Sequence, residues 1–148
     1  MNPQSESDHF LHQAIVAGDI TVVVNYLKEG GSPNVTDKYD CEPIFTAVKY
    51  DRLEMAARLL EAGGDIFRRS KFRSAAFGAA CWNWNPRMID FCLGSGVDIN
   101  AVHEGRTVLD SLAHGKAHIS DAQLPAWTTA WDKLVGLGAK FASAVGTV

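Results

Sequence analysis

Small and apolar positions recur along the chain with a period of 33 residues. Ala14, Ala47 and Ala80 fall on one another at this step, and a last step of 32 brings Ala80 to Leu112. The step of 33 aligns three further sets of residues, namely Val22, Met55 and Met88, then Leu27, Leu60 and Leu93, then Gly30, Gly63 and Gly96. A fixed period of this size predicts one supersecondary unit that is repeated and stacked on its neighbours. Arrays of this kind usually present extended binding surfaces.

The second unit shows which elements the pattern predicts. Turn-forming and charged residues in the segment DKYDCEPIF precede Pro43, which suits the first position of a helix because its missing N–H is not needed there. We expect a short helix over 43–50, a polar break at 51–52 and a second, amphipathic helix that begins at Leu53. Gly63 and Gly64 end that second helix. A single helix pair cannot bury its own apolar face, so stacked neighbours are required.

These segments resemble the ankyrin repeat, in which a β-turn is followed by two antiparallel helices. The family's TPLHxAA segment matches EPIFTAV at 42–48 and TVLDSLA at 107–113, and LHQA at 11–14 matches its core. The family's GADVN segment resembles GGSPN at 30–34, GGDIF at 63–67, GVDIN at 96–100 and GAKF at 138–141. The resemblance covers about residues 8–143, nearly the whole chain.

The resemblance implies an all-α fold, an ankyrin-type helical solenoid of about four helix-turn-helix repeats whose first and last units act as caps. The units are expected at about 8–36, 37–69, 70–101 and 102–143, within a single domain over 8–143. Residues 1–7 are expected to form a flexible polar N-terminus, and residues 144–148 a C-terminal tail.

The third and fourth units depart from the family pattern. The third reads AAFGAA at 75–80, without the proline and the histidine, and continues into WNWNP at 82–86. The fourth carries an insertion near 116–125, in which SDAQ at 120–123 resembles a capping box that starts a helix. Trp127 and Trp131 are four residues apart and are expected to cover the exposed end of the stack.

The composition is that of an ordinary globular protein with enough residues for one domain. Of its 148 residues, 47% are hydrophobic and 21% are charged, and the net charge is −3. This acidic balance argues against general nucleic-acid binding, which usually needs a basic surface. No apolar stretch approaches the roughly 18 residues of a membrane-spanning helix, and the opening MNPQSESDH lacks the basic start and apolar core of a signal peptide. We expect a cytoplasmic protein that binds neither nucleic acid nor membranes.

The number and spacing of the cysteines are consistent with a cytoplasmic protein. Cys41, Cys81 and Cys92 are odd in number and show no CxxC spacing, which argues against a disulfide framework or a zinc site. Cys81 and Cys92 fall at repeat positions that should be apolar, so we expect both to be buried. Cys41 falls in a turn region, so the pattern does not decide whether its side chain is exposed or buried.

The histidines give little sign of chemistry. His114 and His118 have the spacing of two metal ligands on a helix, but Gly115 lies between them and no carboxylate-rich or cysteine partner is near. Asp110 and His114 also have helical spacing, yet no nucleophile motif such as GxSxG accompanies them. Neither GxGxxG nor a phosphate-binding GK[ST] loop is present. We expect no catalytic residue, no bound metal and no cofactor.

The resemblance also implies where a binding surface lies. In ankyrin arrays a partner usually meets the concave side, formed by the turn tips and the outward positions of each first helix. By position, the tip residues are Lys38, Tyr39, Cys41, Lys71, Phe72, Ser74, His103, Glu104 and Arg106. The first-helix residues are Lys49, Tyr50, Trp82, Asn83 and His114, and Trp84 stands beside them in the sequence.

Aromatic residues are the expected anchors of this surface, because they dominate interface hot spots and exposed aromatic patches tend to mark interaction sites. The five anchors are Tyr39, Tyr50, Phe72, Trp82 and Trp84. An alternative for the two tryptophans is that they fold back to fill space left by the small residues Ala75, Ala76 and Gly78.

Four basic residues, Arg68, Arg69, Lys71 and Arg73, fall together at the tip between the second and third units, with no acid between them. Such a positive loop is expected to steer an acidic region of a protein partner. The alternative is a solvated loop without a partner. Four charges in one turn make a poor DNA-binding surface, because affinity for DNA grows with the number of phosphates neutralised.

The sequence therefore predicts a non-catalytic module that binds another protein and is monomeric alone, although the aromatics could also serve self-association. The most specific hypothesis is an immunity protein that neutralises a cognate toxin or effector, because similar small cytoplasmic ankyrin proteins in bacteria include such proteins. The alternative is a regulatory adaptor or scaffold for a cellular protein. An enzyme would need a deep polar pocket, such as one lined by Asp110, His114 and His118.

Overall fold

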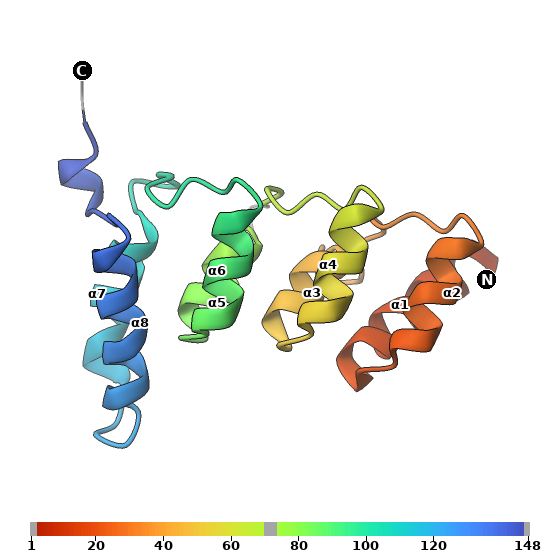
Figure 1. Cartoon of the computed structure of the whole chain (residues 1–148), viewed down its shortest axis with the longest axis horizontal. Coiled ribbons are helices and arrows are strands. Elements are labelled where there is room, and N and C mark those ends of the chain that lie inside the picture. Colours follow the sequence, from red (N-terminus) through yellow and green to blue (C-terminus); the bar gives the residue numbers. More distant parts are fainter. Residues whose placement is uncertain (1–2, 70–73, 147–148) are drawn as a thin grey trace. The chain divides into compact units, whose positions relative to one another are not determined.

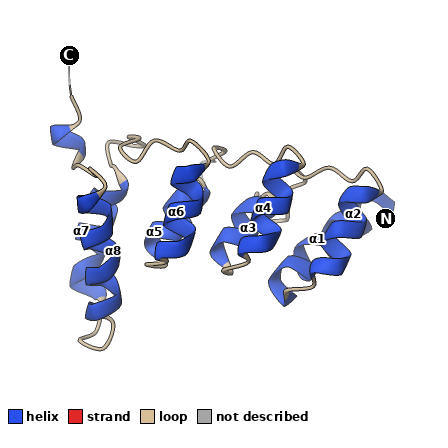
Figure 2. Ribbon diagram, viewed as in Figure 1, coloured by secondary structure: helices blue, strands red, loops and turns tan. Residues whose placement is uncertain are grey.

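The computed structural model describes residues 3–69 and 74–146 of the chain (Figures 1 and 2). Over these residues the secondary structure is helical and no strand is present, which confirms the predicted all-α class. The α-helices are α1 (Pro3–Ala17), α2 (Ile20–Lys28), α3 (Pro43–Lys49), α4 (Leu53–Glu61), α5 (Ala76–Trp82), α6 (Pro86–Gly94), α7 (Val108–Gly115) and α8 (Leu124–Gly136). Two short 3₁₀ helices are η1 (Lys116–His118) and η2 (Ala142–Ala144).

The chain forms two compact units, residues 1–79 and residues 80–148, with the boundary inside α5. The single domain over 8–143 and its four repeats stay a prediction.

The first unit contains two helix pairs that pack on one another. Helix α1 contacts α2 and α3, and α4 contacts α3 and α2. The apolar side chains of Leu11, Ile15, Ile44 and Leu59 are fully buried among these four helices. Each pair therefore covers the apolar face that the other pair could not bury alone, as the repeat pattern predicted.

The helix boundaries of the second repeat follow the predicted signals. Helix α3 begins at Pro43, Tyr50 is its C-terminal cap, and α4 begins at Leu53. Gly63 follows the end of α4 with a φ of +98°, a left-handed conformation that glycine adopts without steric cost.

The start of the chain differs from the prediction. Residues 1–7 were expected to be flexible, but α1 already begins at Pro3. Proline is favoured in the first turn of a helix, because the N–H that it lacks would have no partner there.

Backbone conformations recur with the period of the sequence. Positive φ angles stand after the second helix of each pair, at Gly30, Gly63 and Gly96, and between the two helices of each pair, at Gly18, Asp51 and Trp84. Side-chain oxygens at 32, 65 and 98 each accept a hydrogen bond from the N–H two residues later, in Asn34, Phe67 and Asn100. The 33-residue period of the sequence therefore also appears in these backbone conformations.

In the second unit, α8 packs against both α6 and α7. Met88, Ile89 and Leu134 are fully buried there. On the surface, Lys133 Nζ of α8 lies 2.9 Å from Asp90 Oδ1 of α6. These contacts fix α8 against α6 and α7.

A capping box that the sequence analysis did not identify begins α7. Thr107 Oγ1 accepts from the N–H of Asp110, and Asp110 Oδ2 accepts from the N–H of Thr107 at 2.9 Å. The same Oδ2 accepts from the N–H of Ala142 at 2.8 Å, and Thr107 Oγ1 donates to the Lys140 carbonyl at 2.6 Å. The helix start thus also holds the C-terminal segment in place.

The insertion near 116–125 contains η1 and the start of α8. Gln123 Oε1 accepts from the N–H of Ser120 at 2.9 Å, which is one half of the predicted capping box. The helix starts later than predicted, at Leu124, because Gln123 and not Ser120 is its N-cap. Pro125 then falls in the first turn, where a proline leaves no hydrogen bond unmade.

Candidate functional site

Two neighbouring Lys–Tyr pairs occupy predicted surface positions in the first unit. Lys38 Nζ lies 5.1 Å from the ring centroid of Tyr39, whose side chain is 67% exposed. Lys49 Nζ lies 5.6 Å from the ring centroid of Tyr50, which is 43% exposed. The turn before α3 is held by Asp37 Oδ1, which accepts from the N–H of Tyr39 at 2.9 Å. Each pair places an ammonium group beside an exposed ring.

Arg68 does not contribute a free charge to the predicted basic cluster, and this corrects the sequence analysis. Its Nη1 donates to Glu42 Oε2 at 2.8 Å and to the Asp40 carbonyl at 2.9 Å, and its Nη2 donates to Asp40 Oδ1 at 2.5 Å. Glu42 is fully buried. The hydrogen bond to Asp40 raises the pKa of Arg68, followed by that to Glu42. The guanidinium therefore balances two acids that precede it in the chain.

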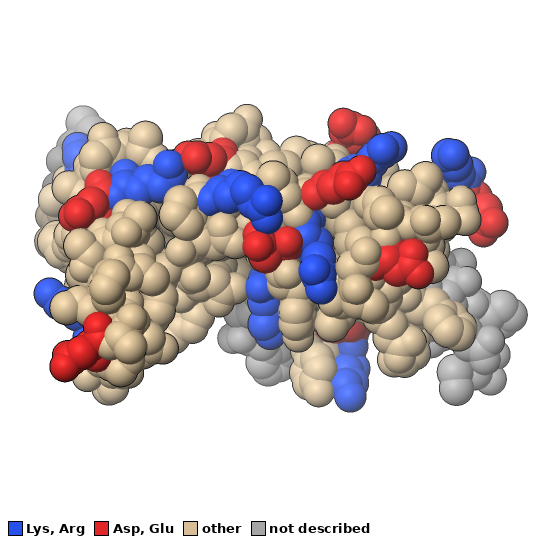
Figure 3. Space-filling model, turned by 60° about the horizontal axis from the view of Figure 1, so that its bottom comes forward, with Lys and Arg blue, Asp and Glu red and all other residues tan. Residues whose placement is uncertain are grey.

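Of the other three basic residues, Arg69 is exposed, whereas Lys71 and Arg73 lie outside the described residues, as does the predicted anchor Phe72. Acidic and basic side chains are interspersed on the face shown in Figure 3. A positive loop therefore stays a prediction that depends on 69–73.

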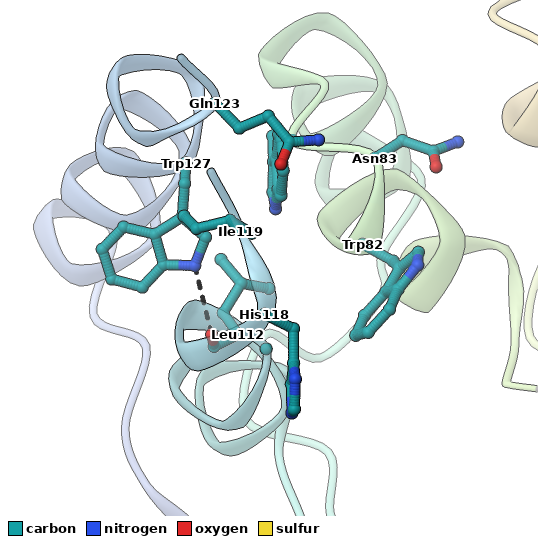
Figure 4. Close-up of a pocket in the computed structure, with 9 residues that line it drawn as sticks. Trp82, Asn83, Leu112, His118, Ile119, Gln123 and Trp127 are labelled. Carbon is teal, nitrogen blue, oxygen red and sulfur yellow. Dashed lines mark hydrogen bonds between the residues drawn. The ribbon is translucent and has the colours of Figure 1, made fainter. Parts of the chain in front are cut away.

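Trp82, Asn83 and Trp84 come together in the second unit. Trp82 ends α5 and is 62% exposed, Asn83 is exposed, and Trp84 is half-buried. Trp82 is thus a surface side chain, and the alternative that it fills space in the core is wrong. Trp82 and Trp84 border a pocket of about 370 Å³, which is also lined by residues of α7, η1 and the start of α8 (Figure 4).

The far wall of this pocket is Trp127 of α8. Its side chain is only 5% exposed, and its indole Nε1 donates to the Leu112 carbonyl at 3.1 Å. Its ring stacks on Trp131 with the centroids 5.0 Å apart, and Trp131 lies 6.0 Å from Phe141. Trp127 therefore packs between α7 and α8. It was predicted to cover the exposed end of the stack.

Trp84 has an unusual backbone conformation. Its φ is +52°, between the two helices of its pair, where Gly18 and Asp51 stand in the two preceding helix pairs. A bulky residue rarely adopts this left-handed region, and doing so costs about 1–2 kcal/mol. Strain of this kind persists where the surrounding structure imposes it, and it often occurs at binding sites.

Gly115 presents the opposite case, a glycine that the backbone does not need. It ends α7 with φ −68° and ψ −21°, ordinary helical values that any residue adopts. Glycine in a helix costs about 1 kcal/mol relative to alanine. A Cβ at this position would lie 3.5 Å from Cζ3 of Trp82, so the missing side chain leaves the pocket open beside that ring.

The pocket is apolar with a polar rim. None of its nine lining residues is Asp, Glu, Lys or Arg. In Figure 4, Ile119 and Gln123 extend from the segment before α8 toward the space that Trp82 borders. Gln123 Oε1 accepts hydrogen bonds from the N–H and the hydroxyl of Ser120. The Nε2 of the same side chain is therefore the donor at the rim. Sequence reasoning identified Trp82, Asn83 and Trp84 but missed the rest, although a glycine inside a helical stretch was a usable signal.

The last predicted residues, His103, Glu104 and His114, lie in two places. His103 and Arg106 exchange backbone hydrogen bonds at 2.9 and 3.0 Å around a tight turn in which Glu104 has a φ of +51°. His114 is exposed on α7, with its ring centroid 5.9 Å from that of His118. No cluster of three or more His, Cys, Asp or Glu side chains that could hold a metal occurs among the described residues.

The two buried cysteines have thiols of low reactivity. Cys81 and Cys92 are buried as predicted, and burial raises the pKa of both thiols, that of Cys92 to about 12. Cys41 is half-buried in its turn, with Sγ 3.7 Å from the Tyr39 carbonyl oxygen. Thiolates are the reactive form of cysteine, so the native protein exposes little thiolate at positions 81 and 92.

No model of a known protein family matches the chain, and a search of curated proteins finds none with significant similarity to it. Among the helices that the structure describes, none is long and apolar enough to cross a membrane.

Proposed function

We propose that this chain is a non-catalytic module that binds another protein through exposed aromatic side chains. The observation that carries the proposal is the exposure of Tyr39, Tyr50 and Trp82 at predicted tip and first-helix positions. Exposing a large aromatic side chain to water is unfavourable. When a partner packs on such a side chain, it contributes about 2 kcal/mol or more to the free energy of binding. Aromatic residues exposed at these predicted tip and first-helix positions are thus best explained by a partner.

The two Lys–Tyr pairs add a preference for acidic surfaces. In each pair the ammonium group is held beside its ring, at 5.1 Å for Lys38 and 5.6 Å for Lys49. A partner that packs on the ring therefore brings its own surface close to a fixed positive charge, which favours carboxylates there. Arg69, with Lys71 and Arg73, belongs to the same proposed contact; Arg68 does not.

An ankyrin-type solenoid of four repeats with capping ends is the architecture that we propose for this module. It is supported by the recurrence of positive φ angles and of side-chain-capped turns with the 33-residue period. Repeat arrays of this type are binding scaffolds far more often than catalysts. The proposal includes no cofactor, no nucleic acid and no membrane, and it takes the chain alone as a monomer.

As a specific role we propose an immunity protein that binds and neutralises a cognate toxin or effector, by covering its active site. This role rests on an analogy of architecture, and architecture alone does not fix a function. A regulatory adaptor for a cellular protein is the alternative, and the same aromatic surface would serve it.

Affinity purification from the native cell tests the binding proposal. We expect one dominant partner to be retained by the wild type and lost from Tyr39→Ala/Tyr50→Ala. Phe67→Ala is the matched control, because Phe67 is a 56% exposed aromatic of the same unit outside the predicted surface. Retention of the partner by the double variant, with unchanged helicity, would contradict the proposal.

Genetics separates the two roles. An immunity gene lies next to the gene of its toxin, and its deletion alone is harmful to the cell. Expression of the captured partner should then be toxic, and co-expression of this chain should relieve the toxicity. A harmless partner from an unlinked gene would favour the adaptor.

A further inference from the structure

The pocket of the second unit is bordered by two residues whose types the local backbone does not favour. Trp84 is in a left-handed conformation that bulky residues avoid, and Gly115 stands in a helical conformation where alanine would be better. Both choices act in the same direction, because one supplies an aromatic wall and the other omits a side chain that would narrow the space. They are independent observations, one of a dihedral angle and one of a missing Cβ.

The chemistry of the walls defines what fits. Trp82 and Trp84 offer indole rings, and Leu112 and Ile119 add aliphatic surface. Trp127 closes the far wall with a side chain that is only 5% exposed, because its ring packs on Trp131 and beneath Lys116. No acidic side chain lines the pocket, and its one ionisable lining residue is His118. The nearby Lys116 Nζ lies 4.9 Å from the ring centroid of Trp127. A cationic occupant would therefore meet no carboxylate there, and an uncharged one avoids the cost of burying a charge. Aromatic walls favour a planar ring, which meets them by stacking or edge-to-face packing. A volume of about 370 Å³ is at the lower end of ligand sites and holds one such group.

The rim supplies a hydrogen bond suited to a peptide. Because Gln123 Oε1 already accepts from Ser120, its amide Nε2 is the part of the side chain that can serve an occupant. An amide donor beside an apolar pocket matches a backbone carbonyl that follows or precedes a buried side chain. A ring attached to a peptide backbone therefore uses both the pocket and its rim.

We propose that this pocket receives one uncharged aromatic side chain of a protein partner. The proposal rests on the proposed function for the source of that side chain, and it adds the chemistry that the partner must present. The occupant is a tryptophan, tyrosine or phenylalanine that protrudes from the partner's surface.

The test uses the full-length, ¹⁵N-labelled protein and N-acetyl-tryptophanamide, a probe that carries the ring on a peptide backbone. We expect saturable shifts of the indole N–H signals of Trp82, Trp84 and Trp127, with no shift at the amides of Gly30 and Gly63 in the other unit. N-acetyl-leucinamide controls for apolar character without a ring, and we expect it to bind at least about tenfold more weakly, a difference of 1.4 kcal/mol. Equal binding of the two probes would overturn the proposal.

Gly115→Leu fills the pocket and should weaken probe binding at least about tenfold. Gly94→Leu is the matched control, because a Cβ there would meet no heavy atom within 4 Å and Gly94 also lies in a helix of this unit. Trp84→Asn is a second variant whose new residue tolerates the left-handed conformation, and it should also lose binding. Unchanged affinity in both pocket variants would overturn the proposal.

Free indole distinguishes the source of the ring. If indole binds tenfold or more tightly than N-acetyl-tryptophanamide, the pocket is a site for a small aromatic molecule and the partner side chain is excluded. These titrations need no partner protein. Absence of probe binding would therefore overturn the pocket proposal and leave untouched the proposed function, which depends on Tyr39 and Tyr50. Conversely, loss of protein binding would not change the result for the pocket.

Discussion

Asn34 and Asn100, two repeat periods apart, make the same pair of hydrogen bonds to the loop of the following repeat. Asn34 Nδ2 donates to the Gly63 carbonyl at 3.1 Å, and its Oδ1 accepts from the N–H of Asp65 at 2.8 Å. Asn100 makes the equivalent bonds to the loop at 138–140, at 3.1 and 2.7 Å. Each asparagine amide therefore joins two loops of its own unit.

Replacing either asparagine by alanine should lower stability. We expect Asn34→Ala and Asn100→Ala each to reduce the free energy of unfolding by about 1 kcal/mol, because two partly exposed hydrogen bonds are lost. Urea denaturation followed by circular dichroism measures the change. Phe67→Ala is the control at the intervening repeat position, where the side chain has no amide, and should change the value by less than about 0.5 kcal/mol. A similar loss in all three variants would contradict a specific role for the amides.

Arg68→Met should destabilise the first unit. The change removes the hydrogen bonds to Asp40 and Glu42 and leaves the fully buried Glu42 carboxyl without this partner. We expect a loss of about 2 kcal/mol in the free energy of unfolding, which is typical of hydrogen bonds to charged groups. Arg69→Met removes the same charge from an exposed neighbour and should have little effect. Equal effects of the two substitutions would show that net charge, and not the ion pair, is responsible.

Asp110 should make stability depend on acid pH. The hydrogen bond from the Thr107 N–H lowers the pKa of Asp110 most, followed by that from the Ala142 N–H. A carboxyl whose pKa is lower in the folded state stabilises that state above its unfolded value of about 3.9, and loses this effect as pH falls through the folded value.

We therefore expect Asp110→Asn to be less stable than the wild type at pH 6 and to show a smaller loss of melting temperature below roughly pH 4. Scanning calorimetry at a series of pH values measures both. Asp132→Asn, on the exposed side of α8, serves as the control. Parallel pH profiles for Asp110→Asn and the wild type would contradict the assigned role.

Thiol titration should distinguish the three cysteines. With an aromatic disulfide reagent at pH 8, Cys41 should react first, because it is the only cysteine that the structure leaves partly exposed. Cys81 and Cys92 should react only in denaturant, because burial raises the pKa of their thiols. Cys41→Ser should abolish the rapid phase. Rapid reaction of all three in the native protein would contradict the packing of α5 and α6.

The sequence predicts the fold best where the signals are local. Pro43 and Gly63 mark helix boundaries through their own backbone restrictions, so α3 and α4 were found with few errors. The capping box of Thr107 and Asp110 had an equally local signal that the analysis overlooked. The start of α1 at Pro3 was missed because the polar composition of 1–7 outweighed the preference of proline for a first helical turn.

The sites are harder to predict because they depend on tertiary packing. Arg68 meets acids 26 and 28 residues earlier in the chain, and no local pattern shows this pairing. The pocket joins Trp82 to residues as distant as Trp127, so only its three consecutive members were identified. The exposure of Tyr39 and Tyr50, in contrast, followed from their places in the repeat.

Calorimetric titration of the captured partner is the most direct test of the claim that Tyr39 and Tyr50 bind a protein. The account predicts that Tyr39→Ala/Tyr50→Ala weakens the complex about 100-fold or more, as expected when two aromatic anchors are removed, while Phe67→Ala changes the affinity less than about threefold. Circular dichroism and the melting temperature confirm that each variant is folded. An unchanged dissociation constant for the folded double variant would contradict the account.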